Sequence, residues 1–196
     1  MHSTKLIRGK PWQAVLGILA CLLFSSMAFA QTPVPSEPRL ALVIGNASYR
    51  SSPLANPVND ARLMETALKN AGFQVLKAEN ANRREMQRMI RDFGEKLKRS
   101  GGVGLFYFAG HGMQVRGNNY LIPLDADIRS EDEVAFDSID AQSVLEKMES
   151  AGNRVNLLIL DACRDNPFIR NSRSAAVGLA TMSAPSGCLL YTSRCV

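Results

Sequence analysis

The sequence predicts an α/β fold with a mainly parallel sheet covered by helices on both faces. Two apolar runs, Val103–Ala109 and Asn156–Leu160, show no alternation of polarity, which is typical of strands buried on both faces. Segments with helical periodicity lie between the predicted strands, and strands that alternate with helices usually form parallel sheets. A chain of 196 residues, 46% of them hydrophobic, suits one domain with a sizeable core.

The N-terminal part of the predicted domain is a linker followed by a strand, a loop and a helix. Residues 31–38 contain three prolines with polar neighbours, which predicts an extended linker. Arg39–Gly45 is expected to be a buried strand, and 46–56, rich in turn formers, a loop at its carboxyl end. A helix is expected over 56–72, because this segment begins with an asparagine cap and a proline and ends at a glycine.

The central part contains a second strand, two helices and a hairpin. Phe73–Ala78 predicts a strand, and apolar residues at helical spacing over 86–97, with basic residues on the other face, predict an amphipathic helix. Gly117-Asn118 is suited to the left-handed positions of a tight hairpin between flanking strands. Apolar residues over 144–148 predict a short third helix before the strand at 156–160.

The first thirty residues have the three zones of a secretory signal peptide. Lys5, Arg8 and Lys10 precede the apolar run Trp12–Phe24, and small residues follow up to Ala30. We expect cleavage after Ala30 and export to the periplasm or the exterior, without a stable membrane anchor because the apolar run is short for a bilayer. Cleavage lowers the formal net charge from +5 to +2, and because no basic stripe with interleaved aromatics remains, nucleic-acid binding is not expected.

Two reactive side chains follow the buried strands. Cys163 comes shortly after the strand over 156–160, and His111 comes shortly after the strand over 103–109, between two glycines. The carboxyl ends of parallel strands are where open α/β sheets usually bind their ligands. The other histidine, His2, lies in the expected leader, so His111 is the candidate imidazole partner of Cys163. A thiol and an imidazole at one sheet edge predict nucleophilic catalysis.

Each of these residues also has an ordinary structural interpretation. A cysteine after a buried strand can be a small core residue or, in an exported protein, half of a disulfide. The expected mature chain keeps Cys163, Cys188 and Cys195, and an odd number leaves at least one thiol free or intermolecular. A histidine between glycines can be a turn residue. Packing does not require two strands that each end in half of a Cys–His pair, so the combination favours chemistry.

Other binding chemistries have little support in the sequence. The glycine spacing of a dinucleotide fingerprint is absent after Gly45, and one histidine in the expected mature chain gives no metal-ligand cluster. The acidic loop over 125–133 could be a solvated surface or a weak cation site, but it lacks the spacing of an EF-hand. We therefore expect no cofactor, with a calcium requirement left open.

Several motifs together resemble the caspase-like cysteine peptidases, most closely their bacterial metacaspase-type relatives. The matching sequence motifs are Ala41-Leu-Val-Ile-Gly-Asn46, Asn56-Pro-Val-Asn-Asp-Ala61, Tyr107-Phe-Ala-Gly-His-Gly112, Asn119-Tyr-Leu-Ile-Pro123 and Leu160-Asp-Ala-Cys-Arg-Asp-Asn-Pro167. The resemblance implies a three-layer α/β/α sandwich and a catalytic domain over 39–187. It also implies that Cys163 is the nucleophile and that His111, 52 positions upstream, is the acid–base partner.

The resemblance suggests the remaining parts of the site as well. The backbone N–H groups of Gly112 and Cys163 would form an oxyanion hole. Asp60 and Asp161 would bind the substrate, a protein or peptide, because metacaspase-type relatives cleave after Arg or Lys and both carboxylates lie near strand ends. Alternatively, Asp60 only favours the start of its helix and Asp161 only makes a structural hydrogen bond. No oligomeric state is predicted.

The C-terminal end departs from the family pattern. Caspase-like domains continue with further strands, whereas residues 188–196 look unlike the family's next strand. This suggests a domain that is truncated at its C-terminal end and followed by an atypical tail. An inactive caspase-like module that serves in interaction or scaffolding is therefore the alternative to an active endopeptidase.

Overall fold

A computed structural model describes most of the predicted domain. The described residues are 36–163, 179–182 and 187–193. By its contacts the chain divides into two units, 1–36 and 37–196, and every helix and strand named below belongs to the second. The predicted signal peptide over 1–30 and most of the linker over 31–38 lie outside the described residues. Within the described part, no helix is both long and apolar enough to cross a membrane.

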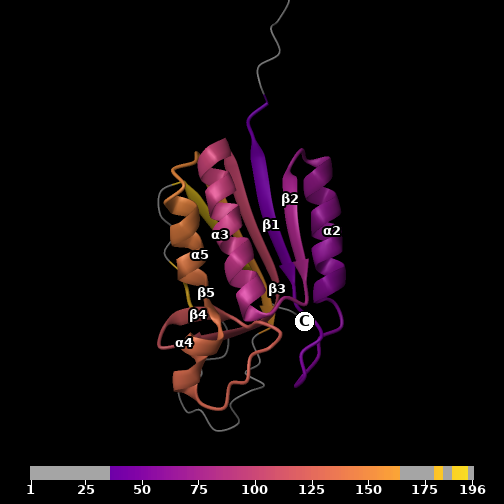
Figure 1. The fold of residues 1–196 in the computed structure, drawn as a ribbon, viewed down its shortest axis with the longest axis vertical. Helices are drawn as coiled ribbons and strands as arrows, with labels where there is room; N and C mark the ends of the chain where they lie inside the picture. Colours follow the sequence, from indigo (N-terminus) through magenta and orange to yellow (C-terminus); the bar gives the residue numbers. More distant parts are fainter. Residues whose placement is uncertain (1–35, 164–178, 183–186, 194–196) are drawn as a thin grey trace, which may run out of the picture. The chain divides into compact units, whose positions relative to one another are not determined.

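A seven-stranded, mainly parallel sheet organises the second unit, as predicted (Figure 1). The strands are β1 (Arg39–Gly45), β2 (Gln74–Glu79), β3 (Val103–Val115), β4 (Asn118–Leu121), β5 (Ile139–Asp140), β6 (Val155–Cys163) and β7 (Cys188–Ser193). The parallel part runs in the order β2-β1-β3-β6-β7. The short strands β4 and β5 add to the far end of β3 in antiparallel pairs.

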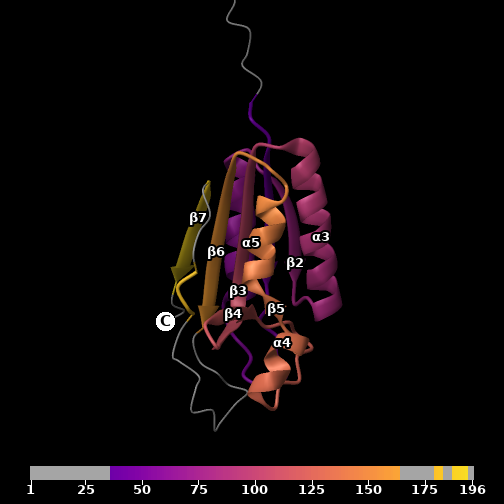
Figure 2. The same ribbon diagram turned by 90° about the vertical axis from the view of Figure 1, so that its left-hand side faces the viewer.

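Helices cover both faces of this sheet, which gives the predicted three layers. The helices that cover it are α2 (Pro57–Asn70), α3 (Arg83–Ser100) and α5 (Ala141–Glu149). The 3-10 turn η1 (Glu131–Glu133) and the short helix α4 (Val134–Asp137) precede β5 in the chain. Helices α3 and α5 lie side by side on one face, as Figure 2 shows, whereas α2 packs on the opposite face. Helix α3 begins where the side chain of Asn82 accepts a hydrogen bond from the N–H of Glu85.

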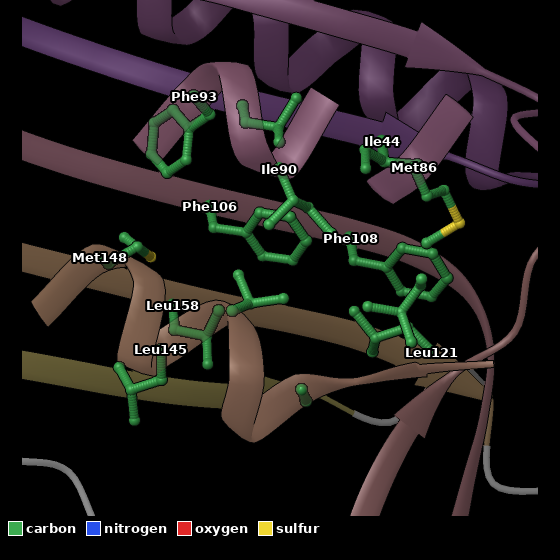
Figure 3. Close-up of a cluster of buried hydrophobic side chains, with 14 of the residues drawn as sticks. Ile44, Met86, Ile90, Phe93, Phe106, Phe108, Leu121, Leu145, Met148 and Leu158 are labelled. Carbon is green, nitrogen blue, oxygen red and sulfur yellow. The ribbon is translucent and has the colours of Figure 1, made fainter. Parts of the chain in front are cut away.

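The larger core fills the layer between the sheet and helices α3 and α5 (Figure 3). Alternate residues of each central strand point into this core, including Ile44, Phe106 and Leu158. The helices contribute side chains at helical spacing, such as Phe93 and Met148, which are both fully buried. The intervening strand residues point to the opposite face and form a smaller core against α2. Every central strand is therefore apolar on both sides, which explains the unbroken apolar runs in the sequence.

Three local predictions need correction. The strand predicted to end at Ala109 continues as β3 through His111 to Val115, because its far end pairs with β4 after its near end has paired with β1 and β6. The strand predicted to end at Leu160 likewise continues as β6 to Cys163. The hairpin turn is also displaced by one residue. Arg116 and Gly117 occupy the left-handed positions, with φ angles of 51° and 84°, and Asn118 already belongs to β4.

Most of the segment predicted to be an atypical tail forms a strand. Residues 188–193 form β7, which pairs in parallel with β6 (Figure 2). Alternate side chains of β7 differ in their surroundings. Cys188 is buried against the larger core with a free thiol, whereas Leu189 and Tyr191 on the other face are 64% and 62% exposed.

Candidate active site

The sheet brings His111 and Cys163 to neighbouring positions. Strands β3 and β6 run parallel and in register from Val103 and Val155 onward, and the last pair of this register is His111 with Cys163. Neighbouring strands lie about 4.8 Å apart in a sheet, so the two backbones are adjacent at this point. The two halves of the predicted Cys–His pair therefore meet at the carboxyl edge of the parallel sheet, although they are 52 positions apart in the sequence.

The imidazole of His111 is buried and held by a backbone carbonyl. Only 2% of the residue is exposed, and Nε2 lies 2.7 Å from the carbonyl oxygen of Ser52, in the loop that follows β1. Because a carbonyl oxygen can only accept a hydrogen bond, Nε2 must carry a proton. In the neutral ring Nδ1 is then the basic nitrogen. Ser52 has a φ of 57°, a left-handed conformation that is uncommon outside glycine.

Tyr49, from the same loop, contacts both the ring and the backbone of His111. The two ring centroids are 4.5 Å apart with an interplanar angle of 53°. The backbone N–H of His111 donates to the Tyr49 hydroxyl over 3.1 Å, and this hydroxyl donates to the carbonyl of Ile122 over 2.9 Å. The loop is itself anchored by Asn46, a fully buried residue whose amide bridges Ala81 and Ile122.

Gly112, the predicted oxyanion-hole residue, follows His111 in β3 at a point of very close packing. A Cβ atom placed on Gly112 would lie 2.7 Å from the Cβ of Ala162 and 3.3 Å from Cδ2 of Leu179. The glycine is therefore required for the approach of β3 to β6 beside the Cys163 position. Packing thus requires a glycine at the position that is also predicted to supply an N–H group to the oxyanion hole.

The two predicted substrate-binding carboxylates lie within electrostatic range of each other. Asp161 precedes Cys163 by two residues in β6, is half-buried, and accepts a hydrogen bond of 3.4 Å from the Tyr107 hydroxyl. Asp60 lies in the first turn of α2. Burial raises the pKa of Asp60, and the negative charge of Asp161 raises it further. The structure thus brings together two acids that are 101 positions apart in the sequence.

A hollow of about 280 Å³ borders the loop that holds His111. It is lined by residues 49–51 of this loop and by residues 124–128. Neither Asp60 nor Asp161 lines it, so the predicted carboxylate pair belongs to a different part of the surface.

The acidic loop over 125–133 uses its carboxylates within the protein. Asp125 accepts a hydrogen bond from the backbone N–H of Arg83, and Asp127 forms an ion pair of 2.6 Å with Arg129. Glu133 accepts hydrogen bonds from the backbone N–H groups of Arg129 and Ser130. Among the residues that the structure describes, no group of three or more His, Cys, Asp or Glu side chains is placed to hold a metal ion.

Sequence reasoning missed the contributions of Ser52 and Tyr49. Ser52 acts through its main-chain oxygen, which leaves no signal in the side-chain pattern. Tyr49 lies in the segment 46–56, whose turn-forming residues predict only a loop. The detectable signal was an aromatic residue inside such a polar loop, because a tyrosine is more often buried than the serines and asparagines around it.

The comparisons with known proteins identify a family. The family model described as the caspase domain, a peptidase family, matches residues 38–191. The human protein named mucosa-associated lymphoid tissue lymphoma translocation protein 1 is 32% identical over 132 residues, which cover 66% of this chain and 15% of that protein. Its mouse homolog is 33% identical over 138 residues, which cover 68% of this chain and 16% of that protein. The chain thus spans only a small part of the length of these relatives.

Proposed function

This chain belongs to the caspase domain family, and on that premise we propose that it is a cysteine endopeptidase that uses Cys163 and His111. The observation that carries the proposal is the register of β3 and β6, which pairs these two residues at the carboxyl edge of the sheet. The contact between Nε2 of His111 and the Ser52 carbonyl supports it, because this contact orients the imidazole and assigns the basic nitrogen to Nδ1.

The reaction follows from these assignments. Nδ1 of His111 accepts the thiol proton of Cys163, and the thiolate attacks the carbonyl carbon of the scissile peptide bond. The C–N bond then breaks while His111 returns the proton to the departing amine, which leaves an acyl group on the sulfur. A water molecule, deprotonated by His111, hydrolyses this thioester and restores the thiol. The Ser52 carbonyl stabilises the imidazolium that forms in each half of the cycle, and no step requires a cofactor.

The negative oxygen of each tetrahedral intermediate requires hydrogen-bond donors. We assign this role to the backbone N–H groups of Gly112 and Cys163. Gly112 directly follows His111 in β3, and Cys163, the last residue of β6, supplies both the nucleophile and one donor, so both donors belong to the carboxyl edge where the reacting groups meet. Donors that are already oriented stabilise a developing charge without reorganisation.

We propose that the scissile peptide bond follows an Arg or Lys residue of the substrate. Asp161 lies two residues from the nucleophile, and its charge acts on the carboxyl group of Asp60. Two carboxylates at close range repel each other, and a substrate guanidinium or ammonium placed between them relieves this repulsion. The charge of Asp161, which lies two residues from the nucleophile and close enough to act on Asp60, therefore favours a cationic substrate side chain over an acidic one.

Turnover of fluorogenic peptides tests the chemistry. Cys163→Ala should abolish hydrolysis with a nearly unchanged melting temperature, and His111→Ala should lower kcat by about two to four orders of magnitude. Full turnover by the Cys163→Ala variant would contradict the assignment of the nucleophile. A loss below tenfold in His111→Ala would make that histidine structural.

Paired peptides that end in Arg or Asp before the fluorophore test the specificity. The Arg peptide should be cleaved faster, and Asp161→Asn should lose about 2 to 5 kcal/mol of this discrimination, because a charge pair is left unmatched. Tyr107→Phe is the matched control, since it removes the hydroxyl that contacts Asp161 but keeps the carboxylate. Faster cleavage of the Asp peptide would overturn the specificity while leaving the peptidase assignment intact.

A further inference from the structure

The hydroxyl of Tyr49 occupies a place in the sheet where a backbone hydrogen bond would be expected. Strands β3 and β4 pair in antiparallel register, with Gly112 opposite Leu121, so the next pair is His111 with Ile122. One bond of this pair is direct, from the N–H of Ile122 to the carbonyl of His111 over 3.0 Å. The other is replaced by a bridge in which the His111 N–H donates to Tyr49 and Tyr49 donates to the Ile122 carbonyl.

The surrounding residues make room for this bridge. A Cβ atom on Gly110 would lie 2.7 Å from the Tyr49 hydroxyl oxygen, so a glycine is needed next to the inserted hydroxyl. The Ile122 carbonyl also accepts a hydrogen bond of 3.3 Å from the buried amide of Asn46. Removal of the hydroxyl would thus leave the buried His111 N–H without its acceptor, or would draw β3 and β4 together to close the pair directly.

Either consequence would move the imidazole. The ring of Tyr49 lies against the ring of His111, and the same loop continues to Ser52, whose carbonyl contacts Nε2. Tyr49 therefore acts on His111 through the main chain and through the ring, while Ser52 acts on the ring nitrogen. Three contacts from one loop fix the position, tilt and tautomer of the imidazole.

We propose that Tyr49 is a positioning residue, whose hydroxyl spreads β3 and β4 at His111 and thereby holds the imidazole toward the Ser52 carbonyl. The effect on turnover rests on the proposed peptidase function, whereas the effect on the imidazole does not. The conservative variant Tyr49→Phe removes the hydroxyl and keeps the ring. Tyr120→Phe is the matched control, because Tyr120 is also buried in this hairpin, and among the described residues its hydroxyl makes no hydrogen bond.

The first readout is the nitrogen spectrum of the imidazole, measured on the full chain by long-range ¹H–¹⁵N correlation with a His2→Gln background to leave one histidine. The wild type should show the tautomer protonated at Nε2. Tyr49→Phe should show a mixture of tautomers or a shifted ring, and Tyr120→Phe should match the wild type. An unchanged spectrum in Tyr49→Phe, or an equal change in both variants, would overturn the proposal.

The second readout is turnover per active site. Tyr49→Phe should lower kcat by about 10- to 100-fold with KM within about twofold, because a displaced catalytic group costs rate rather than binding. If the chain has no peptidase activity, the spectrum still decides the proposal. If Tyr49→Phe does not fold, the wild type decides it: a slowly exchanging Tyr49 hydroxyl proton with an NOE to the His111 amide proton is expected, and its absence would contradict the bridge.

Discussion

Substitution of Gly112 by alanine tests the close packing on which the site depends. The new Cβ would lie 2.7 Å from the Cβ of Ala162, whereas methyl groups in contact prefer about 3.5 to 4.0 Å. Neither atom is the end of a flexible side chain, so β3 and β6 must separate by about 1 Å. Overpacking of this kind lowers the unfolding free energy by about 1 to 3 kcal/mol. Alanine offsets about 0.5 to 1 kcal/mol of this loss, because it loses less conformational entropy on folding than glycine does.

The midpoints of these two ranges differ by about 1.3 kcal/mol, so we expect Gly112→Ala to lose about 1.3 kcal/mol of unfolding free energy, which lowers Tm by about 3 to 5 °C for a chain of this size. Thermal and urea unfolding measure the loss. The double variant Gly112→Ala/Ala162→Gly removes the opposing Cβ and should recover most of it, with a coupling energy of about 1 kcal/mol or more. A fully stable single variant, or a double variant in which the two losses simply add, would refute the packing argument.

Two further predictions concern stability alone. The raised pKa of Asp60 means that the folded chain binds more protons than the unfolded chain just above pH 3.8, so stability falls as pH rises through the raised pKa. Asp60→Asn should therefore raise Tm at pH 7 but not below pH 3.8, and an equal gain at both pH values would contradict the electrostatic cause. Arg116 has a φ of 51° in the hairpin turn, and its only ion pair among the described residues, with Glu131, is exposed and weak. Because asparagine adopts this left-handed conformation more easily than arginine, Arg116→Asn should raise the unfolding free energy by about 0.5 kcal/mol. The charge-preserving control Arg116→Lys should show no gain in urea unfolding, and a gain as large as that of asparagine would rule out the backbone explanation.

The central strands and the three longer helices, α2, α3 and α5, could be predicted because their signals are local. The run over 103–109 is apolar without alternation since helices cover both of its faces, and the spacing of Met86, Ile90, Phe93 and Leu97 follows from one buried helix face. Buried positions are occupied by apolar residues, so the sequence shows directly which positions of a strand or helix are buried.

The details of the site depended on contacts between distant segments. His111 resembles a loop residue in the sequence, but β4 pairs with the strand beyond it and extends β3 to Val115. The partner of Nε2 is a main-chain oxygen, at Ser52, and the choice of that oxygen depends on the path of a whole loop. Cys163 and His111 could be paired from the sequence only because parallel strands place their carboxyl ends together.

The most direct test of the central claim is covalent labelling of the thiol. The full chain would be incubated with a peptidyl acyloxymethyl ketone that ends in Arg, in parallel with one that ends in Asp, and the adduct located by mass spectrometry of the digested protein. The proposed pair of Cys163 and His111 predicts a single adduct on Cys163, formed faster with the Arg reagent and at least about 100-fold more slowly in His111→Ala. Labelling that falls on Cys188 or Cys195, or that proceeds at the same rate without His111, would contradict it.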